Sequence, residues 1–176
     1  MSKIKRMKRT FLVVIFAFFC GALFAQTDSL PVYKQFPTVP PFKLMLVPDS
    51  TAFTKADLKE KIPTIIMVFS PDCDHCIHAT ESLLKHMDLF TKAQIVMGTA
   101  LSYNHIQKFY TDFNMGAYPN IHVGLDNSYF LGTFYSVHSF PSIFVYDKKG
   151  KLMKSYEGTV KWEEIGKALK EGKFKD

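Results

Sequence analysis

Residues 68–84 read "VFSPDCDHCIHATESLL": the end of an apolar run, a turn, and two cysteines separated by two residues. The whole run, "TIIMVFS" at 64–70, is continuous and rich in β-branched residues, which is typical of a strand buried on both faces. Beyond the cysteines, apolar and small side chains recur at helical spacing and predict an amphipathic helix to about residue 90. The cysteine pair therefore lies where a central strand turns into a helix.

Three interpretations fit such a pair: a redox centre, part of a metal site, or a structural bridge. At the strand-to-helix turn, the partial positive charge of a helix N-terminus favours the thiolate form of Cys73 and predicts that it is the nucleophile. Cys76, one turn into the helix, is expected to be shielded and to act as the resolving thiol. A static bridge explains the pair less well, because closing so short a loop gains little entropy.

The residues between and beside the cysteines are predicted to adjust their redox poise. A protonated His75 stabilises the Cys73 thiolate and with it the reduced form, which makes the oxidised pair a stronger oxidant. Asp72 and Asp74 act in the opposite sense, because their negative charges oppose a thiolate.

The N-terminus predicts export. "MSKIKRMKRT" carries five basic residues and no acidic one, and it leads into an apolar run of fifteen residues, 11–25. This pattern indicates a signal peptide over residues 1–25, cleaved after Ala25, and a periplasmic or otherwise extracytoplasmic protein. The alternative is an uncleaved membrane anchor, although the run is short of the roughly 20 residues that span a bilayer.

Charge and cysteine content narrow the class of protein once residues 1–25 are set aside. The remaining chain has 17 basic and 16 acidic residues, a formal net charge of about +1, so nothing in its charge favours nucleic acid. Membrane contact is expected only if the N-terminal segment stays uncleaved. Two cysteines remain, too few for a disulfide-stapled scaffold, and the chain is long enough for one hydrophobic core.

The rest of the chain alternates between strand and helix patterns. Residues 26–40 contain three prolines and no apolar period, which predicts an extended leader before a domain over 41–176. Strands are expected at 42–47, 64–70, 93–101, 121–125, 142–147 and 151–157. Helices are expected at 54–61, from 77 to about 90, and at 104–113, 126–135 and 160–172. This order predicts an α/β fold with a mixed sheet of about five strands and helices on both faces.

A second signal is "SVHSFPSIFVYD" at 136–147. A proline immediately before an apolar strand cannot donate to the sheet, so Pro141 marks the start of a strand, where a cis Phe140–Pro141 bond is expected.

Together the C-x-x-C at the end of a central strand and this proline resemble the thioredoxin superfamily. Within it, the chain is similar over residues 41–172 to exported thiol–disulfide oxidoreductases of the TlpA/ResA type. The resemblance implies a three-layer fold, Cys73 as attacking thiol, Cys76 as resolving thiol, and a cis-proline, Pro141, whose loop aligns a partner's backbone. It also implies protein thiol or disulfide partners, an upstream thiol donor or acceptor, and a redox-active Cys73–Cys76 disulfide without an organic cofactor. Phe140 is expected to contact substrate. An apolar groove for partner polypeptides is predicted around the disulfide, lined by Phe140, Tyr103, Tyr110 and Phe134.

The chain departs from that family pattern at two positions. Asp72 stands where an aromatic residue usually precedes the first cysteine, and Met67 stands where thioredoxin has a buried acid. The group that takes the proton from Cys76 is therefore left open, with Glu81 as one candidate.

Metal binding is the alternative function. Cys73, Cys76 and His138, the last on the loop before Pro141, are suitable ligands for Cu(I) or Zn. This set resembles that of the thioredoxin-fold copper chaperones of the Sco type, although those proteins have three residues between the cysteines. His105 and His122 have no ligand residues beside them in the sequence and are expected to be surface or satisfied polar residues.

Overall fold

The computed structural model describes residues 30–174, so the predicted signal peptide over residues 1–25, with Cys20, lies outside the described residues. From Pro31 onward the chain groups into one unit. Its single sheet has the strand order β2-β1-β5-β4-β3-β6-β7. The strands are β1 (Lys43–Leu46), β2 (Ala52–Thr54), β3 (Thr64–Val68), β4 (Gln94–Thr99), β5 (Ile121–Leu125), β6 (Ser142–Tyr146) and β7 (Leu152–Glu157).

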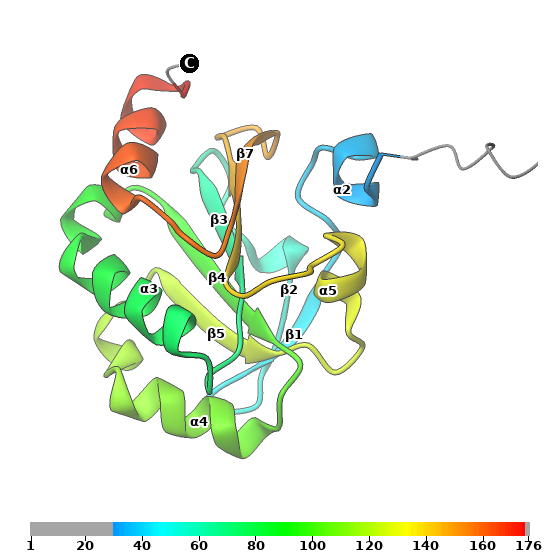
Figure 1. The fold of residues 1–176 in the computed structure, drawn as a ribbon, viewed down its shortest axis with the longest axis vertical. Helices are drawn as coiled ribbons and strands as arrows, with labels where there is room; N and C mark the ends of the chain where they lie inside the picture. Colours follow the sequence, from blue (N-terminus) through cyan, green and yellow to red (C-terminus); the bar gives the residue numbers. More distant parts are fainter. Residues whose placement is uncertain (1–29, 175–176) are drawn as a thin grey trace, which may run out of the picture. The chain divides into compact units, whose positions relative to one another are not determined.

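Helices cover both faces of this sheet, as Figure 1 shows. Helices α3, α4 and α6 pack on one face, whereas α2 and α5 pack on the other. The helices are α2 (Val32–Gln35), α3 (Asp74–Lys85), α4 (Tyr103–Asp112), α5 (Phe130–Phe134) and α6 (Trp162–Glu171). Short 3-10 turns are η1 (Lys55–Asp57), η2 (Met87–Phe90) and η3 (Met115–Ala117). The predicted three-layer α/β fold with a mixed sheet is confirmed.

Strand β3 lies in the interior of the sheet, between β4 and β6, and both of its faces are buried and apolar. It pairs in parallel with β4 and antiparallel with β6. Ile65 and Met67 pack in the core beneath α3, α4 and α6, whereas Ile66 and Val68 pack in the core beneath α2 and α5. This alternation follows the two-residue period of a strand and explains why the run 64–70 shows no polar face.

The sheet has seven strands in the described residues, whereas about five were expected. The unforeseen strand is β2, three residues that pair antiparallel with β1 at the sheet edge. It ends at Thr54, the first residue of the segment where a helix was expected at 54–61. Thr54 donates its N–H and its hydroxyl to the Asp57 carboxylate in a capping box, but this box begins only the single turn η1.

The leader expected over residues 26–40 also differs from the structure in its described part. Residues 32–35 form α2, where Tyr33 packs edge-on against Phe144, with ring centroids 5.1 Å apart. Val39 donates its N–H to the Gly150 carbonyl at 3.0 Å. These residues belong to the unit because the Tyr33 side chain, which lies between two prolines in the sequence, enters the core. The proline-rich composition of the segment gave no indication of this packing.

None of the helices in residues 30–174 combines the length and apolarity needed to cross a bilayer.

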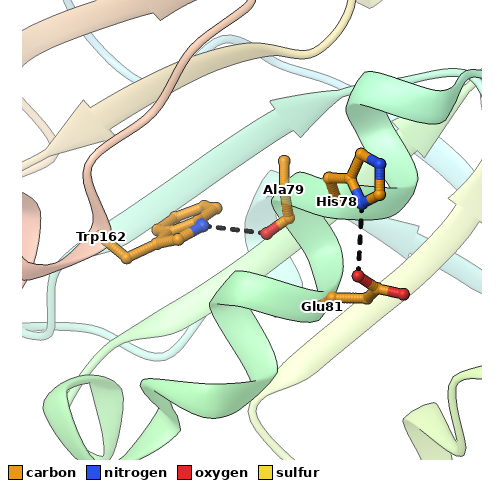
Figure 2. Close-up of polar contacts among 4 residues, drawn as sticks. All are labelled: His78, Ala79, Glu81 and Trp162. Carbon is orange, nitrogen blue, oxygen red and sulfur yellow. Dashed lines mark hydrogen bonds and ion pairs between the residues drawn. The ribbon is translucent and has the colours of Figure 1, made fainter.

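Helix α6 is attached to α3 through the only tryptophan of the chain. Trp162 is fully buried and donates its indole N–H to the Ala79 carbonyl at 2.9 Å (Figure 2). Its ring also meets Phe90 edge-on at 5.7 Å between centroids. The buried indole N–H thus has a hydrogen-bond acceptor, and the large apolar ring is removed from water.

We expect Trp162→Ala to lower the free energy of unfolding by about 3–5 kcal/mol, the usual cost of emptying a large aromatic site in a core. Urea unfolding followed by far-UV circular dichroism measures this loss. Phe36→Ala is the matched control, since Phe36 is 62% exposed and its truncation is expected to cost less than about 0.5 kcal/mol. Equal losses in the two variants would contradict the assignment of Trp162 as a core residue.

Candidate redox site

The two cysteines lie where β3 passes into α3. Cys73 is the N-cap residue of α3, with extended backbone angles, and its N–H donates to the Ser70 carbonyl at 3.2 Å. Its own carbonyl accepts the N–H of Ile77 at 2.9 Å, the first bond of the helix. The Cys73 side chain is partly exposed, so the sulfur at the positive end of a twelve-residue helix is accessible.

Cys76 has the opposite environment. Its side chain is fully buried in the core, and its sulfur accepts the backbone N–H of Ser70 at 3.5 Å. Burial, together with the neighbouring Cys73, raises the pKa of the Cys76 thiol from 9.0 to about 12, although the Ser70 N–H acts in the other direction. Both cysteines are free thiols. The pair thus combines one accessible sulfur with one that stays protonated at neutral pH.

The loop before β6 forms the other side of the site. Pro141 follows a cis Phe140–Pro141 bond, as expected, and is buried. The Phe140 carbonyl lies 4.0 Å from the Cys73 sulfur. The pairing of Val68 with Ser142 produces this approach, because it places the last residue of β3 opposite the first residue of β6.

Ser142 contributes to this loop in a way that sequence reasoning missed. Its hydroxyl donates to the Ser139 carbonyl at 2.8 Å and closes the turn around the proline. A buried serine at a strand start gives no distinctive sequence signal, because only the folded loop places a carbonyl within reach.

The histidine and the acid that were expected to influence the cysteines, His75 and Glu81, are both exposed. His75 is exposed in the first turn of α3, and no hydrogen bond or ion pair joins its side chain to another of the described residues. Its tuning role therefore remains a prediction from position. Glu81 points to solvent and pairs with His78 at 3.4 Å (Figure 2). Five positions along a helix separate Glu81 from Cys76 by roughly 140°, so Glu81 does not face the buried thiol.

The ligand set of the metal alternative is not assembled. His138 is exposed on the loop before Pro141. Within residues 30–174, no three His, Cys, Asp or Glu side chains gather closely enough to hold a metal ion. Cys73, Cys76 and His138 therefore do not form a site in this conformation.

One polar pair next to Cys73 was missed. The Asp72 carboxylate, in the residue before Cys73, lies 3.3 Å from Nδ1 of His105 in the first turn of α4. His105 was expected to be an unremarkable surface residue because its partner is distant in sequence. Helix α4, which follows β4 in the chain, brings His105 to the site.

An apolar pocket of about 230 Å³ adjoins the proline loop through Phe140. Its remaining lining residues come from the ends of β3 and β4 and from the α5 region: Val68, Phe69, Gly98, Thr99, Ala100, Asp126, Tyr129, Gly132 and Val137. Phe140 and Tyr129 are 42% and 65% exposed, large values for aromatic side chains. Of the four aromatic residues predicted to line an apolar groove, only Phe140 lines this pocket. Tyr103 and Tyr110 pack on one sheet face and Phe134 on the other.

The difference between the two thiols predicts their reactivity in the reduced protein. Iodoacetamide at pH 8 is expected to modify Cys73 and to spare Cys76, because the Cys76 thiol is buried and its pKa is about 12. Peptide mass spectrometry gives the site of modification, and the same reaction in denaturant is the control in which both cysteines react.

The raised pKa of Cys76 also predicts a pH dependence of stability. The neutral thiol is favoured by folding, so its contribution is complete below pH 9.0 and is lost as the pH rises toward about 12. In urea titrations of the reduced protein, Cys76→Ala is expected to reduce the fall in unfolding free energy above pH 9.0. Modification of both cysteines at pH 8, or an unchanged fall in the variant, would contradict this description.

Comparison with known proteins agrees with this geometry. A family model described as a thioredoxin-like domain matches residues 50–173. No curated protein sequence matches the chain.

Three solved structures are similar in fold. A conserved protein from Geobacillus kaustophilus is 20% identical, with a TM-score of 0.65, and the match covers 77% of this chain and 82% of that one. The exposed lipoprotein thioredoxin Etrx1 from Streptococcus pneumoniae is 24% identical, with a TM-score of 0.57 and coverage of 75% and 99%. A secreted disulfide oxidoreductase from Mycobacterium tuberculosis is 16% identical, with a TM-score of 0.62 and coverage of 74% and 96%.

The family model covers most of the chain, including the cysteine pair and the cis-proline loop, and the similar structures share the same fold. The expected superfamily is thereby confirmed. The chain belongs to the thioredoxin-like domain family.

Proposed function

We propose that the chain is a thiol–disulfide oxidoreductase that exchanges disulfides with protein partners through Cys73 and Cys76. The observation that carries this proposal is the asymmetry of the pair: an accessible sulfur at a helix N-terminus and, within the same turn, a buried sulfur. Membership of the thioredoxin-like family supports it, as does the fold shared with a protein named a disulfide oxidoreductase.

In the reducing direction, the Cys73 thiolate attacks one sulfur of a partner disulfide. That S–S bond breaks, a mixed disulfide forms, and the partner's second sulfur leaves as a thiolate and takes up a proton. Cys76 then loses its proton and attacks the Cys73 sulfur, which releases the partner's first sulfur. The partner gains two electrons and the Cys73–Cys76 pair becomes a disulfide. An upstream thiol donor returns the pair to the reduced form, and the reverse sequence oxidises a partner.

The two sulfurs carry both electrons, so the reaction requires no organic cofactor. Burial of Cys76 supports an ordered exchange, because a partner disulfide meets Cys73 first and Cys76 acts only after the mixed disulfide has formed. His75, exposed in the first turn of α3, acts on the Cys73 charge when protonated.

The partner's backbone passes the Phe140–Pro141 loop. The Phe140 carbonyl lies 4.0 Å from the Cys73 sulfur. A partner chain bonded to that sulfur passes this carbonyl, which can orient the chain by accepting one of its N–H groups. The exposed Phe140 ring and the adjoining apolar pocket support binding of an apolar side chain beside the partner's cysteine.

The proposed location is outside the cytoplasm, in the periplasm or an equivalent compartment. The basic and apolar N-terminal pattern supports export, and two proteins of similar fold are named as an exposed lipoprotein and a secreted protein. Such compartments allow protein disulfides to persist as partners.

Serine substitutions separate the two steps. Cys73→Ser is expected to abolish exchange with a small disulfide reporter, because the accessible nucleophile is lost. Cys76→Ser is expected to keep the first attack and to accumulate a mixed disulfide on Cys73. Mass spectrometry before and after dithiothreitol treatment detects that adduct. Full exchange by Cys73→Ser would contradict the proposed function.

Phe140→Ala tests the partner-binding surface. We expect KM for a disulfide-bonded peptide with an apolar residue beside its cysteine to rise about threefold to tenfold, since the lost apolar contact contributes about 1 kcal/mol. The rate with a small disulfide reporter is expected to stay unchanged. Phe36→Ala is the control, since it removes the same type of side chain at another exposed position, outside the lining of the pocket. An unchanged KM for the peptide in Phe140→Ala would remove Phe140 from the binding surface.

A further inference from the structure

The pair Asp72–His105 links the loop before Cys73 to helix α4. The Oδ2 atom of Asp72 lies 3.3 Å from the Nδ1 atom of His105, and the two side chains are 64% and 55% exposed. Asp72 is joined to Cys73 by a peptide bond, whereas His105 is 33 positions away in the chain. Helix α4 therefore brings an ionisable group to one of the two acidic residues that flank Cys73 in the sequence.

We infer that His105 is a positioning residue for Cys73: it holds Asp72 and offsets the Asp72 charge when protonated. This inference rests on the proposed function, because it concerns the reactivity of the attacking thiol. A carboxylate beside a thiol disfavours the thiolate, since the two negative charges repel. A cation on His105 pairs with that carboxylate and weakens the repulsion.

The pair makes the reactivity of Cys73 depend on pH beyond the titration of the thiol itself. A histidine changes its charge between about pH 5 and 8. When His105 is protonated, the pair Asp72–His105 is neutral, and the Cys73 thiolate is opposed least. When His105 is neutral, Asp72 is uncompensated, and the thiolate is opposed most.

Other charged or titratable groups lie on the elements that surround the site. Asp74 and His75 lie on α3, and His138 lies on the loop before Pro141. None of these three side chains has an ion pair with another described residue, whereas Lys108, on α4 with His105, is paired with Asp112. They remain the same in every variant of the test below, so their effects on Cys73 cancel in the comparison.

The test measures the rate at which neutral iodoacetamide modifies Cys73 in the reduced full-length chain, with the Cys73 peptide followed by mass spectrometry. His105→Gln is expected to slow the reaction about twofold to fourfold near pH 6, the range for an exposed ion pair, and to leave it unchanged near pH 8.5. His105→Lys keeps a cation at both pH values. It is expected to retain the wild-type rate near pH 6 and to exceed it about twofold to fourfold near pH 8.5.

Two controls make the result specific to Asp72. His78→Gln removes a histidine from a comparable exposed pair, His78–Glu81 at 3.4 Å on α3 (Figure 2), and is expected to change neither rate. In an Asp72→Asn background, His105→Gln is expected to have no further effect at either pH. Equal slowing by His105→Gln at both pH values, or slowing that persists in the Asp72→Asn background, would overturn the inference.

The alkylation assay also keeps this inference separate from the proposed function. Alkylation reports the thiolate of Cys73 without any disulfide partner. The expected pH pattern without disulfide exchange would disprove the proposed function and leave the role of His105 intact. Disulfide exchange without the pH pattern would do the reverse.

Discussion

The antiparallel pairing of β3 with β6 is the constraint on which the site depends. Because Val68 pairs with Ser142, the residue that ends β3 lies opposite the residue that follows the cis-proline. The segment that follows β3 carries Cys73, and the segment that precedes β6 carries Phe140. The Phe140 carbonyl therefore lies 4.0 Å from the Cys73 sulfur. A shift of one residue in this register would turn Ile65 and Met67 to the opposite face of the sheet, so the packing of two core layers maintains the geometry of the reactive loop.

Burial gives the two cysteine side chains different chemical properties. Cys73 precedes the helix and keeps contact with solvent, whereas Cys76 turns inward beneath it and loses its hydration. A buried thiol ionises reluctantly, because the core does not stabilise the thiolate as water does. Met67, fully buried in the same core, supplies no acid to assist, and Glu81 faces solvent. In the proposed exchange, burial therefore opposes the deprotonation of Cys76.

The segment between β4 and β6 adds features on both faces of the sheet. Helix α4 contributes His105 to the loop before Cys73, and the region of α5 contributes Tyr129 to the pocket beside Phe140. Asp126 organises the second of these regions, since its buried carboxylate accepts the N–H of Leu131 at 2.7 Å and the Ser128 hydroxyl at 3.0 Å. Its carboxylate thus satisfies one N–H group in the first turn of α5, although this helix begins at Phe130, with Tyr129 as its N-cap residue, and not at 126.

The sequence by itself determined the strand-to-helix turn at Cys73, the proline before β6 and the layered α/β class, because these follow from local periodicity and from the geometry of proline. It did not reveal β2, whose three residues gain their structure from pairing with β1, or α2, which is held by Tyr33 against Phe144. The Asp72–His105 pair, the hydroxyl of Ser142 that closes the proline loop and the pocket beside Phe140 were decided only by the tertiary structure. Each depends on the distance between groups that are separated in the chain or packed on different elements, and that distance is set by sheet register and helix packing.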